Sequence, residues 1–368
     1  MGAFVGMMRR RLSTGASGSL DHRHTPTHGE VMASRIGTSL TQQALQYAFD
    51  ARPFTMAEAA LHGVTRRRVQ CAVEAGKVTH LRRGLYVASC ATPRDRLLAL
   101  QQQLGGREVA AISGCRSAAD VWGLPVLGVH GPLPESLPSI WVPPGTARPG
   151  VRGGVHYLVG EVPRDHVVAL PDGLVVTTPL RTAVDVVRLA RLPRRLALAT
   201  IVGGMRAHVA YAAGIDLRDA GAITALMQDA EQREAVREEL RTVADASPAW
   251  GMTSVRACVS VADPRLENAL ESISFGRFLD AGVRLPRPQA WLPGASGRLW
   301  RVDFWWEELG IVGEADGMVK YADRQVLIDE KGRQLDLEGP GRSVHRWGWG
   351  NALRHDDPLM AQLLSRLR

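Results

Sequence analysis

Two carboxylates stand two positions apart near the end of an apolar run. The segment GEADGMVKY (313–321) carries Glu314 and Asp316, and Lys320 follows four residues later. On an extended strand the two acidic side chains lie on one face, roughly 6–7 Å apart. At an effective dielectric constant of about 20, their mutual repulsion is about 2–3 kcal/mol. A cation, an arginine or a shared proton has to offset that repulsion.

A third acid is predicted to join this pair from a neighbouring strand. The segment LWRVDFWW (299–306) alternates as a half-buried strand does, and it places Asp303 among aromatic side chains. A carboxylate there is expensive to bury without a partner. Asp303, Glu314 and Asp316 would converge on one point, which suits Mg²⁺ or Mn²⁺. The alternative is a salt-bridge network with the nearby arginines Arg301, Arg324 or Arg333.

A helix is predicted just before these strands, over 263–282. Asp263 would be its N-cap, Pro264 its first residue and Gly282 its end. Glu267 and Glu271 are four residues apart, so both would project from one face. Taken alone, such a pair is more often a solvated face than a binding site.

The N-terminal third reads as an arm followed by a small basic domain. Residues 1–38 are rich in small and polar residues without periodicity, which predicts a disordered arm. Residues 39–92 then predict three short helices and a hairpin, with Thr55 and Glu58 at capping-box spacing and Thr65 as a further N-cap. This order is that of a winged helix-turn-helix.

Arginines gather on the two elements that such a domain presents to DNA. Arg66, Arg67 and Arg68 fall in the first turn of the third helix, where a recognition helix enters the major groove. Arg82 and Arg83 fall on the hairpin, within reach of backbone phosphates. The alternative is that both clusters are only a solvated face.

Composition agrees with an acidic partner. The chain has 368 residues, 45% of them hydrophobic, with a formal net charge of +8 and a pI near 9.8. Nucleic acid is therefore the first candidate partner and a membrane surface the second. The winged helix-turn-helix pattern makes double-stranded DNA the nucleic acid expected. The four cysteines show no paired spacing and no apolar stretch reaches the length of a bilayer, so a cytoplasmic protein without membrane segments is expected.

The rest of the chain predicts an α+β and α/β multidomain protein. Residues 93–245 alternate short strands with helices, ending in a charged helical connector, and they suggest no chemistry. Residues 246–368 carry the acidic helix and the strands described above.

At this point the C-terminal part resembles a known family. The pieces LENALES, RVDFWW, EADGMVKY, DEKGRQLDL and SVHRWGW cover about 263–350 in the order found in very-short-patch-repair-like endonuclease domains. These domains belong to the PD-(D/E)xK restriction-endonuclease-like superfamily. The resemblance implies hydrolysis of DNA phosphodiesters with Asp303 and Glu314 binding metal, Glu271 as supporting acid (Glu267 as a substitute) and Lys320 acting on the phosphate or water.

One departure from the superfamily pattern bears on activity. The usual lysine two residues after the second acid is replaced by Asp316. Lys320 would then have to act from the next turn, or Lys331 from the following helix; otherwise the site binds metal and cuts poorly.

The N-terminal part resembles the AbiEi-type antitoxin domain, a winged helix that represses its own toxin–antitoxin operon. The segments GKVTHLRRGLYV and ISGCRSAADVWGLP carry this resemblance, which adds a cognate toxin or self-association as candidate partners. Three interpretations therefore remain open at the level of sequence: a Mg²⁺-dependent endodeoxyribonuclease, a repressor with a degenerate nuclease-like core, and a scaffold whose acids are structural.

Overall fold

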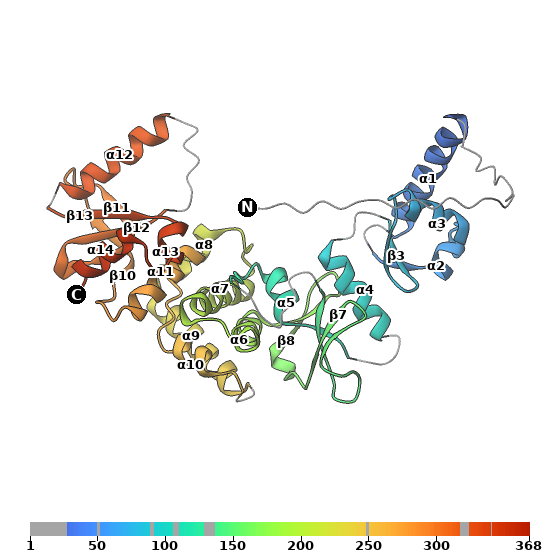
Figure 1. Cartoon of the computed structure of the whole chain (residues 1–368), viewed down its shortest axis with the longest axis horizontal. Coiled ribbons are helices and arrows are strands. Elements are labelled where there is room, and N and C mark those ends of the chain that lie inside the picture. Colours follow the sequence, from blue (N-terminus) through green and yellow to red (C-terminus); the bar gives the residue numbers. More distant parts are fainter. Residues whose placement is uncertain are drawn as a thin grey trace, which may run out of the picture. The chain divides into compact units, whose positions relative to one another are not determined.

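The chain forms two compact units, residues 1–90 and residues 91–368, each with α and β structure (Figure 1). The computed structural model describes residues 28–49, 52–88, 92–105, 110–128, 137–247, 250–316, 324–339 and 341–368. The predicted mixture of helices and several sheets is confirmed.

The first unit consists of three helices and a small antiparallel sheet. Its elements are α1 (His28–Phe49), β1 (Phe54–Thr55), α2 (Met56–Leu61), α3 (Arg66–Glu74), β2 (Thr79–Arg82) and β3 (Leu85–Val87), and the strand order is β1-β3-β2. Leu45, Phe54 and Val69 are fully buried in its core. Helix α1 begins at His28, inside the segment 1–38 that we expected to be an arm. The residues 28–38 contain no proline, so nothing in them stops a helix.

Capping residues fix the helix starts of this unit as predicted. Thr55 accepts from the backbone of Glu58, and the Glu58 carboxylate accepts from the backbone N–H of Thr55, which completes a capping box. Thr65 accepts from the backbone N–H of Arg68 at the start of α3. The first turn of α3 is therefore held by Thr65 and not by its arginine side chains.

The second unit begins with a six-stranded mixed sheet in the order β6-β7-β5-β4-β9-β8. Its strands are β4 (Ile112–Ser113), β5 (Ser139–Val142), β6 (Gly150–Arg152), β7 (Val155–Val159), β8 (Val167–Ala169) and β9 (Val175–Thr177). The helices that accompany and follow it are α4 (Pro93–Gly105), α5 (Cys115–Trp122), α6 (Pro179–Ala190), α7 (Arg194–Ala213), α8 (Ala220–Leu226), α9 (Ala230–Asp245) and α10 (Thr253–Val259). Pro179 opens α6 directly after the N-cap residue Thr178.

Helix α7 lies in the middle of this unit and packs against α6 and α11 (Ala269–Asp280). Among the described helices it is the one long and apolar enough to cross a membrane, whereas the sequence led us to expect none. Of its most apolar window, 72% is buried inside the unit. Such burial is that of a core helix, because a lipid-facing helix would keep its apolar surface on the outside.

The unit ends in a four-stranded sheet in the order β10-β11-β12-β13. Its elements are α11, β10 (Arg287–Pro293), β11 (Leu299–Trp306), β12 (Ile311–Ala315), α12 (Arg324–Glu338), β13 (Ser343–Trp347), α13 (Trp349–Leu353) and α14 (Pro358–Arg366). Strands β10, β11 and β12 are antiparallel, and β13 runs parallel to β12. A parallel neighbour needs a crossover connection, and α12 lies in that connection.

Aromatic rings hold this sheet against α11. The ring of Phe278 packs edge-on against Phe304, Trp306 and Trp347. A Cβ at Gly313 would lie 2.6 Å from the Trp347 ring. Glycine is therefore required next to Glu314 so that β12 can approach these rings closely.

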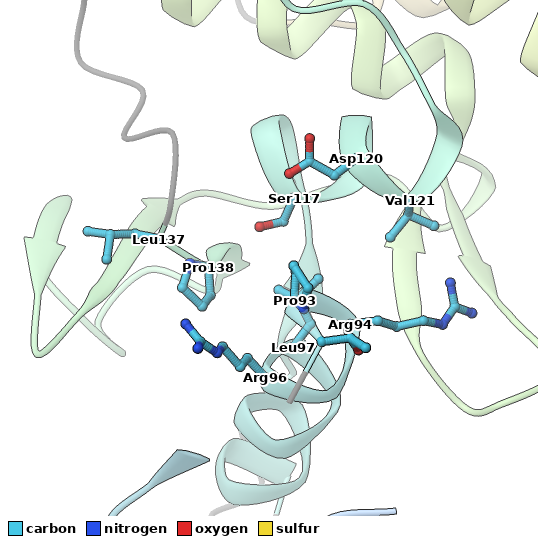
Figure 2. Close-up of a pocket in the computed structure, with 10 residues that line it drawn as sticks. Pro93, Arg94, Arg96, Leu97, Ser117, Asp120, Val121, Leu137 and Pro138 are labelled. Atoms are coloured by element: carbon cyan, nitrogen blue, oxygen red, sulfur yellow. The ribbon is translucent and has the colours of Figure 1, made fainter. Parts of the chain in front are cut away.

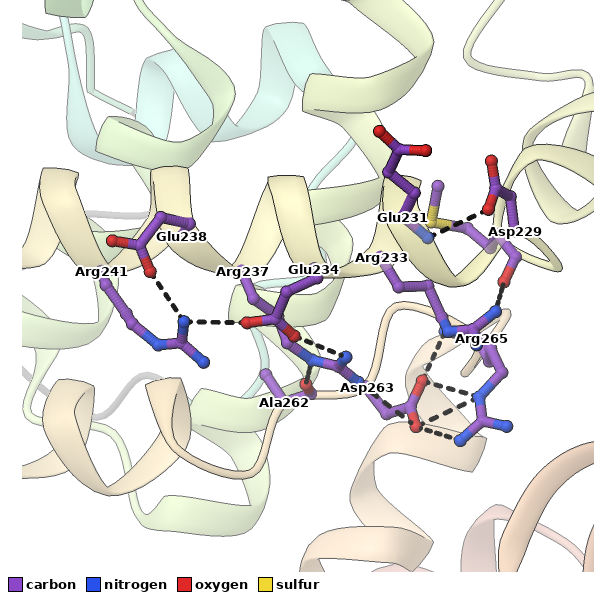
Figure 3. Close-up of polar contacts among 11 residues, drawn as sticks. Asp229, Glu231, Arg233, Glu234, Arg237, Glu238, Arg241, Ala262, Asp263 and Arg265 are labelled. Carbon is purple, nitrogen blue, oxygen red and sulfur yellow. Dashed lines mark hydrogen bonds and ion pairs between the residues drawn. The ribbon is translucent and has the colours of Figure 1, made fainter.

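The helix predicted over 263–282 begins later than expected. Helix α11 starts at Ala269, and Asn268 is its N-cap. Asp263 instead accepts from Arg265 at 2.6 Å and lies 3.7 Å from Arg237 (Figure 3). Glu267 therefore precedes the helix, and the predicted shared helical face with Glu271 is wrong.

Candidate functional site

Asp303 and Glu314 lie opposite each other on neighbouring strands. The paired register of β11 and β12 ends at Phe304 and Gly313, so the next two residues along that register are Asp303 and Glu314. The backbone N–H of Ala315 donates to Asp303 Oδ2 at 2.8 Å. Glu314 is only 3% exposed. The two acids that the sequence predicted to meet are thus brought together by the sheet.

Glu271 reaches the same place from the first turn of α11. Gln289 of β10 connects it to Asp303, because the Gln289 Nε2 donates to Glu271 Oε2 at 2.9 Å and to Asp303 Oδ1 at 3.4 Å. The backbone N–H of Glu267 also donates to Glu271 Oε2, at 2.8 Å. We call Glu271, Asp303 and Glu314 the carboxylate cluster.

Gln289 adopts a backbone conformation that is rare for its residue type. Its φ is 52° and it is 3% exposed, although it lies within strand β10. The left-handed region costs a side chain other than glycine about 1–2 kcal/mol. Strain of this kind persists where the surroundings hold it, and it often marks functional sites. At Gln289 this backbone conformation directs the side-chain amide toward the carboxylates of Glu271 and Asp303.

The surroundings of the carboxylate cluster favour the protonated, neutral form of its acids. Burial raises the pKa of Glu314 to about 8, and the facing Asp303 raises it further while Arg333 opposes the shift. Burial also raises the pKa of Glu271 to about 8, with Asp303 acting in the same direction. The pKa of Asp303 rises to about 6 through burial, against the hydrogen bond from Ala315. A bound cation would relieve all three shifts.

Arginines already neutralise part of this charge. The Arg333 Nη2 on α12 donates to Glu314 Oε1 at 2.8 Å and to the backbone oxygen of Arg301 at 2.7 Å. The Arg301 Nη1 lies 2.6 Å from Glu267 Oε1. Of the arginines in the salt-bridge alternative, Arg333 therefore pairs with an acid of the cluster and Arg301 with Glu267 outside it, while the side chain of Arg324 lies outside the described residues.

Asp316, the third acid that we expected to converge here, raises the pKa of both Asp303 and Glu314 through its negative charge. It follows the end of β12, and its Oδ2 accepts from the Arg346 Nη1 of β13 at 3.0 Å. Within the described parts of the chain, no group of three histidine, cysteine or acidic side chains is arranged to hold a metal ion. Lys320 lies outside the described residues, and Lys331 is exposed on α12.

The predicted DNA-facing arginines are exposed where the structure describes them. Arg66, Arg67 and Arg68 occupy the first turn of α3 and are all exposed. Arg83 is exposed in the turn between β2 and β3, and the side chain of Arg82 lies outside the described residues. These positions leave the guanidinium groups of α3 free to meet a large anionic partner.

Two residues of the site were not singled out from the sequence. Gln289 has no distinguishing motif, since its role depends on a positive φ within a strand. Arg346 lies in the segment SVHRWGW, and its partners Asp316 and Glu330 are brought to it by the parallel pairing of β12 and β13 and by α12.

A cavity of about 340 Å³ lies elsewhere in the second unit (Figure 2). Pro93, Arg94 and Arg96 at the start of α4 line one side, and Ser117 and Asp120 of α5 line the other. Its lining contains no member of the carboxylate cluster. The candidate site is therefore defined by side-chain chemistry on the two central strands of the four-stranded sheet and not by this cavity.

No family model matches the sequence. Two uncharacterized proteins of Mycobacterium tuberculosis are similar to it: Rv2248 of strain ATCC 25618 / H37Rv and MT2308 of strain CDC 1551 / Oshkosh. Each is 28% identical over 283 residues, which is 76% of this chain and 89% of the relative. The similarity spans most of both chains, and it brings no activity with it because both relatives are uncharacterized.

Proposed function

We propose that the chain is a DNA-binding protein whose second unit contains a metal-dependent endonuclease-like core. The observation that carries this proposal is the pair of half-buried Asp303 and buried Glu314, which face each other across β11 and β12. Their raised pKa values make a cation the natural partner of the pair. The order of helix α11, three antiparallel strands, helix α12 and parallel strand β13 supports an α/β core of the restriction-endonuclease-like kind.

The first unit supports DNA binding. Three helices with a strand before the second and a hairpin after the third have the order of a winged helix-turn-helix. The exposed Arg66, Arg67 and Arg68 begin α3, which is the helix that would enter the major groove. Phosphate contacts from such arginines provide affinity without reading sequence.

The residues present fit a hard divalent cation in part. Asp303 and Glu314 supply carboxylate oxygens from two adjacent strands, which are the ligands that Mg²⁺ and Mn²⁺ prefer. The carboxylate of Asp316 is held by Arg346, just as that of Glu314 is held by Arg333. A divalent cation held by Asp303 and Glu314 would supply Lewis acidity toward a phosphate oxygen and its attacking water. Arg333 would then share Glu314 with the cation.

Hydrogen bonds from neighbouring residues hold the carboxylates of Glu271 and Asp303 in fixed positions. Gln289 fixes Glu271 and Asp303 relative to each other through its amide N–H groups. Ala315 holds the second oxygen of Asp303 from the neighbouring strand. Preorganisation of this kind is what electrostatic catalysis requires, because groups that are already fixed need not reorganise during the reaction.

A second candidate function is a transcriptional repressor of the AbiEi antitoxin type with a non-catalytic core. A specific observation favours it: Glu314 is paired with Arg333 and Asp316 with Arg346, so arginines offset the acids without a metal. Asp316 also stands where the superfamily places its lysine. DNA binding is common to both candidates, and metal binding separates them.

Titration with Mn²⁺, followed by its electron paramagnetic resonance signal, tests the metal site directly. The endonuclease proposal predicts one bound ion in wild type and none in Asp303→Asn. The exposed Glu307, which follows β11, provides a matched control, so Glu307→Gln should bind as wild type does. Equal binding by Asp303→Asn and wild type would leave the repressor as the better proposal.

A further inference from the structure

Two arginines beside the carboxylate cluster have unused hydrogen-bond donors. Arg346 uses one nitrogen, Nη1, for both of its acidic partners, Asp316 and Glu330. Its Nε and Nη2 are buried and have no hydrogen-bond partner in the described structure. Arg333 likewise uses Nη2 for Glu314 and for a backbone oxygen, and its Nε is buried without a partner among the described residues.

Buried guanidinium donors without acceptors are unfavourable, because they have lost water and gained nothing in exchange. The unused nitrogens of Arg346 are adjacent members of one planar group, so they present a fork. A fork of this kind matches two oxygens of a phosphate or carboxylate better than it matches a single carbonyl. The carboxylates that contact Arg346 among the described residues, Asp316 and Glu330, already meet the opposite nitrogen.

The position of these arginines relates them to the proposed reaction. Arg346 is the register partner of Glu314 in the parallel pair of β12 and β13, and Arg333 contacts Glu314 from α12. Both therefore flank the carboxylate that we propose binds the cation. Asp316, two residues after Glu314, stands where a lysine would supply positive charge, and it draws Arg346 to that place.

We propose that Arg346, assisted by Arg333, is the phosphate-binding group of the site and takes the place of the lysine that the sequence lacks. The inference rests on the proposed function, and the ligand is a phosphodiester of DNA. In the free chain Asp316 and Glu330 hold Nη1 of Arg346, which leaves the Nε–Nη2 fork for the phosphate. The negative charge of Asp316 beside the fork opposes the binding of a second anion.

Variants of Arg346 and Asp316 distinguish a phosphate-binding arginine from one that serves only as the partner of an ion pair. Inorganic phosphate is titrated into the full chain at constant ionic strength, and binding is followed by the phosphorus-31 resonance. Arg346→Ala should weaken binding by roughly tenfold or more. Arg346→Lys should lie between, since it keeps the charge and loses the fork. Asp316→Asn should bind phosphate as tightly as wild type or more tightly.

A matched control is Arg354→Ala, which removes the same charge from an exposed position of the second unit. It should leave phosphate binding unchanged. The inference is overturned if Arg346→Ala binds phosphate as wild type does, or if Asp316→Asn loses binding together with Arg346→Ala. Thermal unfolding of each variant identifies any that fail to fold, and Arg346→Lys then carries the comparison.

Plasmid nicking by the same variants separates this inference from the proposed function. If wild type does not nick but its phosphate binding depends on Arg346, the proposed nuclease activity is contradicted and the proposed anion site is supported. If wild type nicks and Arg346→Ala is equally active and binds phosphate equally well, the nuclease proposal is supported and the proposed role of Arg346 is contradicted. Loss of both activities in Arg346→Ala supports both proposals.

Discussion

Asp303 on β11 and Glu314 on β12 lie opposite each other just beyond the last hydrogen-bonded pair of their strands. Two carboxylates in that relationship repel, and burial strengthens the repulsion because water no longer screens it. Arg333 donates a hydrogen bond to Glu314, and the backbone N–H of Ala315 donates one to Asp303. The pKa values of both acids stay raised in spite of these contacts, mainly through burial, which favours the binding of a further positive group.

The first prediction concerns the pH dependence of stability in metal-free protein. The pKa of Glu314 is raised from 4.5 to about 8 on folding, so the folded state binds this proton more tightly than the unfolded state. The resulting stabilisation is fully present below pH 4.5 and is lost as the pH rises through about 8. Urea denaturation across this range should show a fall in the free energy of unfolding that is smaller in Glu314→Gln.

The control for this effect is Glu307→Gln, an exposed glutamate beside the end of β11. It should follow the wild-type curve. Parallel curves for wild type and Glu314→Gln would mean that Glu314 is ionised in the folded protein throughout, and that Arg333 suffices as its partner.

The second prediction concerns the strained backbone at Gln289. Alanine and glycine both remove the amide that joins Glu271 and Asp303, but only glycine adopts a φ of 52° without strain. Gln289→Ala should therefore be less stable than Gln289→Gly by about 1–2 kcal/mol. Chemical denaturation of the two variants gives this difference directly. Equal stabilities would indicate that the strand relaxes to an ordinary conformation once the amide is gone.

The third prediction concerns DNA affinity and its dependence on salt. Replacing Arg66, Arg67 and Arg68 with alanine removes three exposed positive charges from the first turn of α3. Each lost phosphate contact should lower the slope of log affinity against log salt by about 0.9. Fluorescence anisotropy with a labelled duplex at several salt concentrations measures both quantities.

A charge-matched control for this experiment replaces three exposed arginines of the second unit, namely Arg164, Arg218 and Arg256. If the control weakens DNA binding as much as the α3 variant does, binding reflects net charge and no recognition helix is needed to explain it.

Local sequence signals predicted the elements whose causes are themselves local. Strand β11 begins and ends where the alternation of LWRVDFWW does, at Leu299 and Trp306. The caps Thr55 and Thr65 lie where their spacing predicted. Helix α11 started later than predicted because Asn268 competes with Asp263 as a cap, and Asp263 is taken by Arg265.

Of the residues that form the candidate site, only the acids could be predicted from the sequence. Asp303 and Glu314 could be paired from the sequence because their strands are consecutive and antiparallel. The contact between Arg346 and Asp316 depends on a parallel strand that returns through α12, and periodicity does not encode which residues then meet. Gln289 depends on one unusual backbone angle, for which its residue type gives no signal.

Nicking of supercoiled plasmid in the presence of Mg²⁺ or Mn²⁺ is the most direct test of the proposed endonuclease activity. Wild type, Glu314→Ala and the exposed control Glu307→Ala are compared, with DNA retardation on a gel measured for each. The endonuclease proposal predicts nicking by wild type and by Glu307→Ala, no nicking by Glu314→Ala, and DNA binding by all three proteins. Binding without nicking by every protein, wild type included, would contradict the endonuclease and favour the repressor.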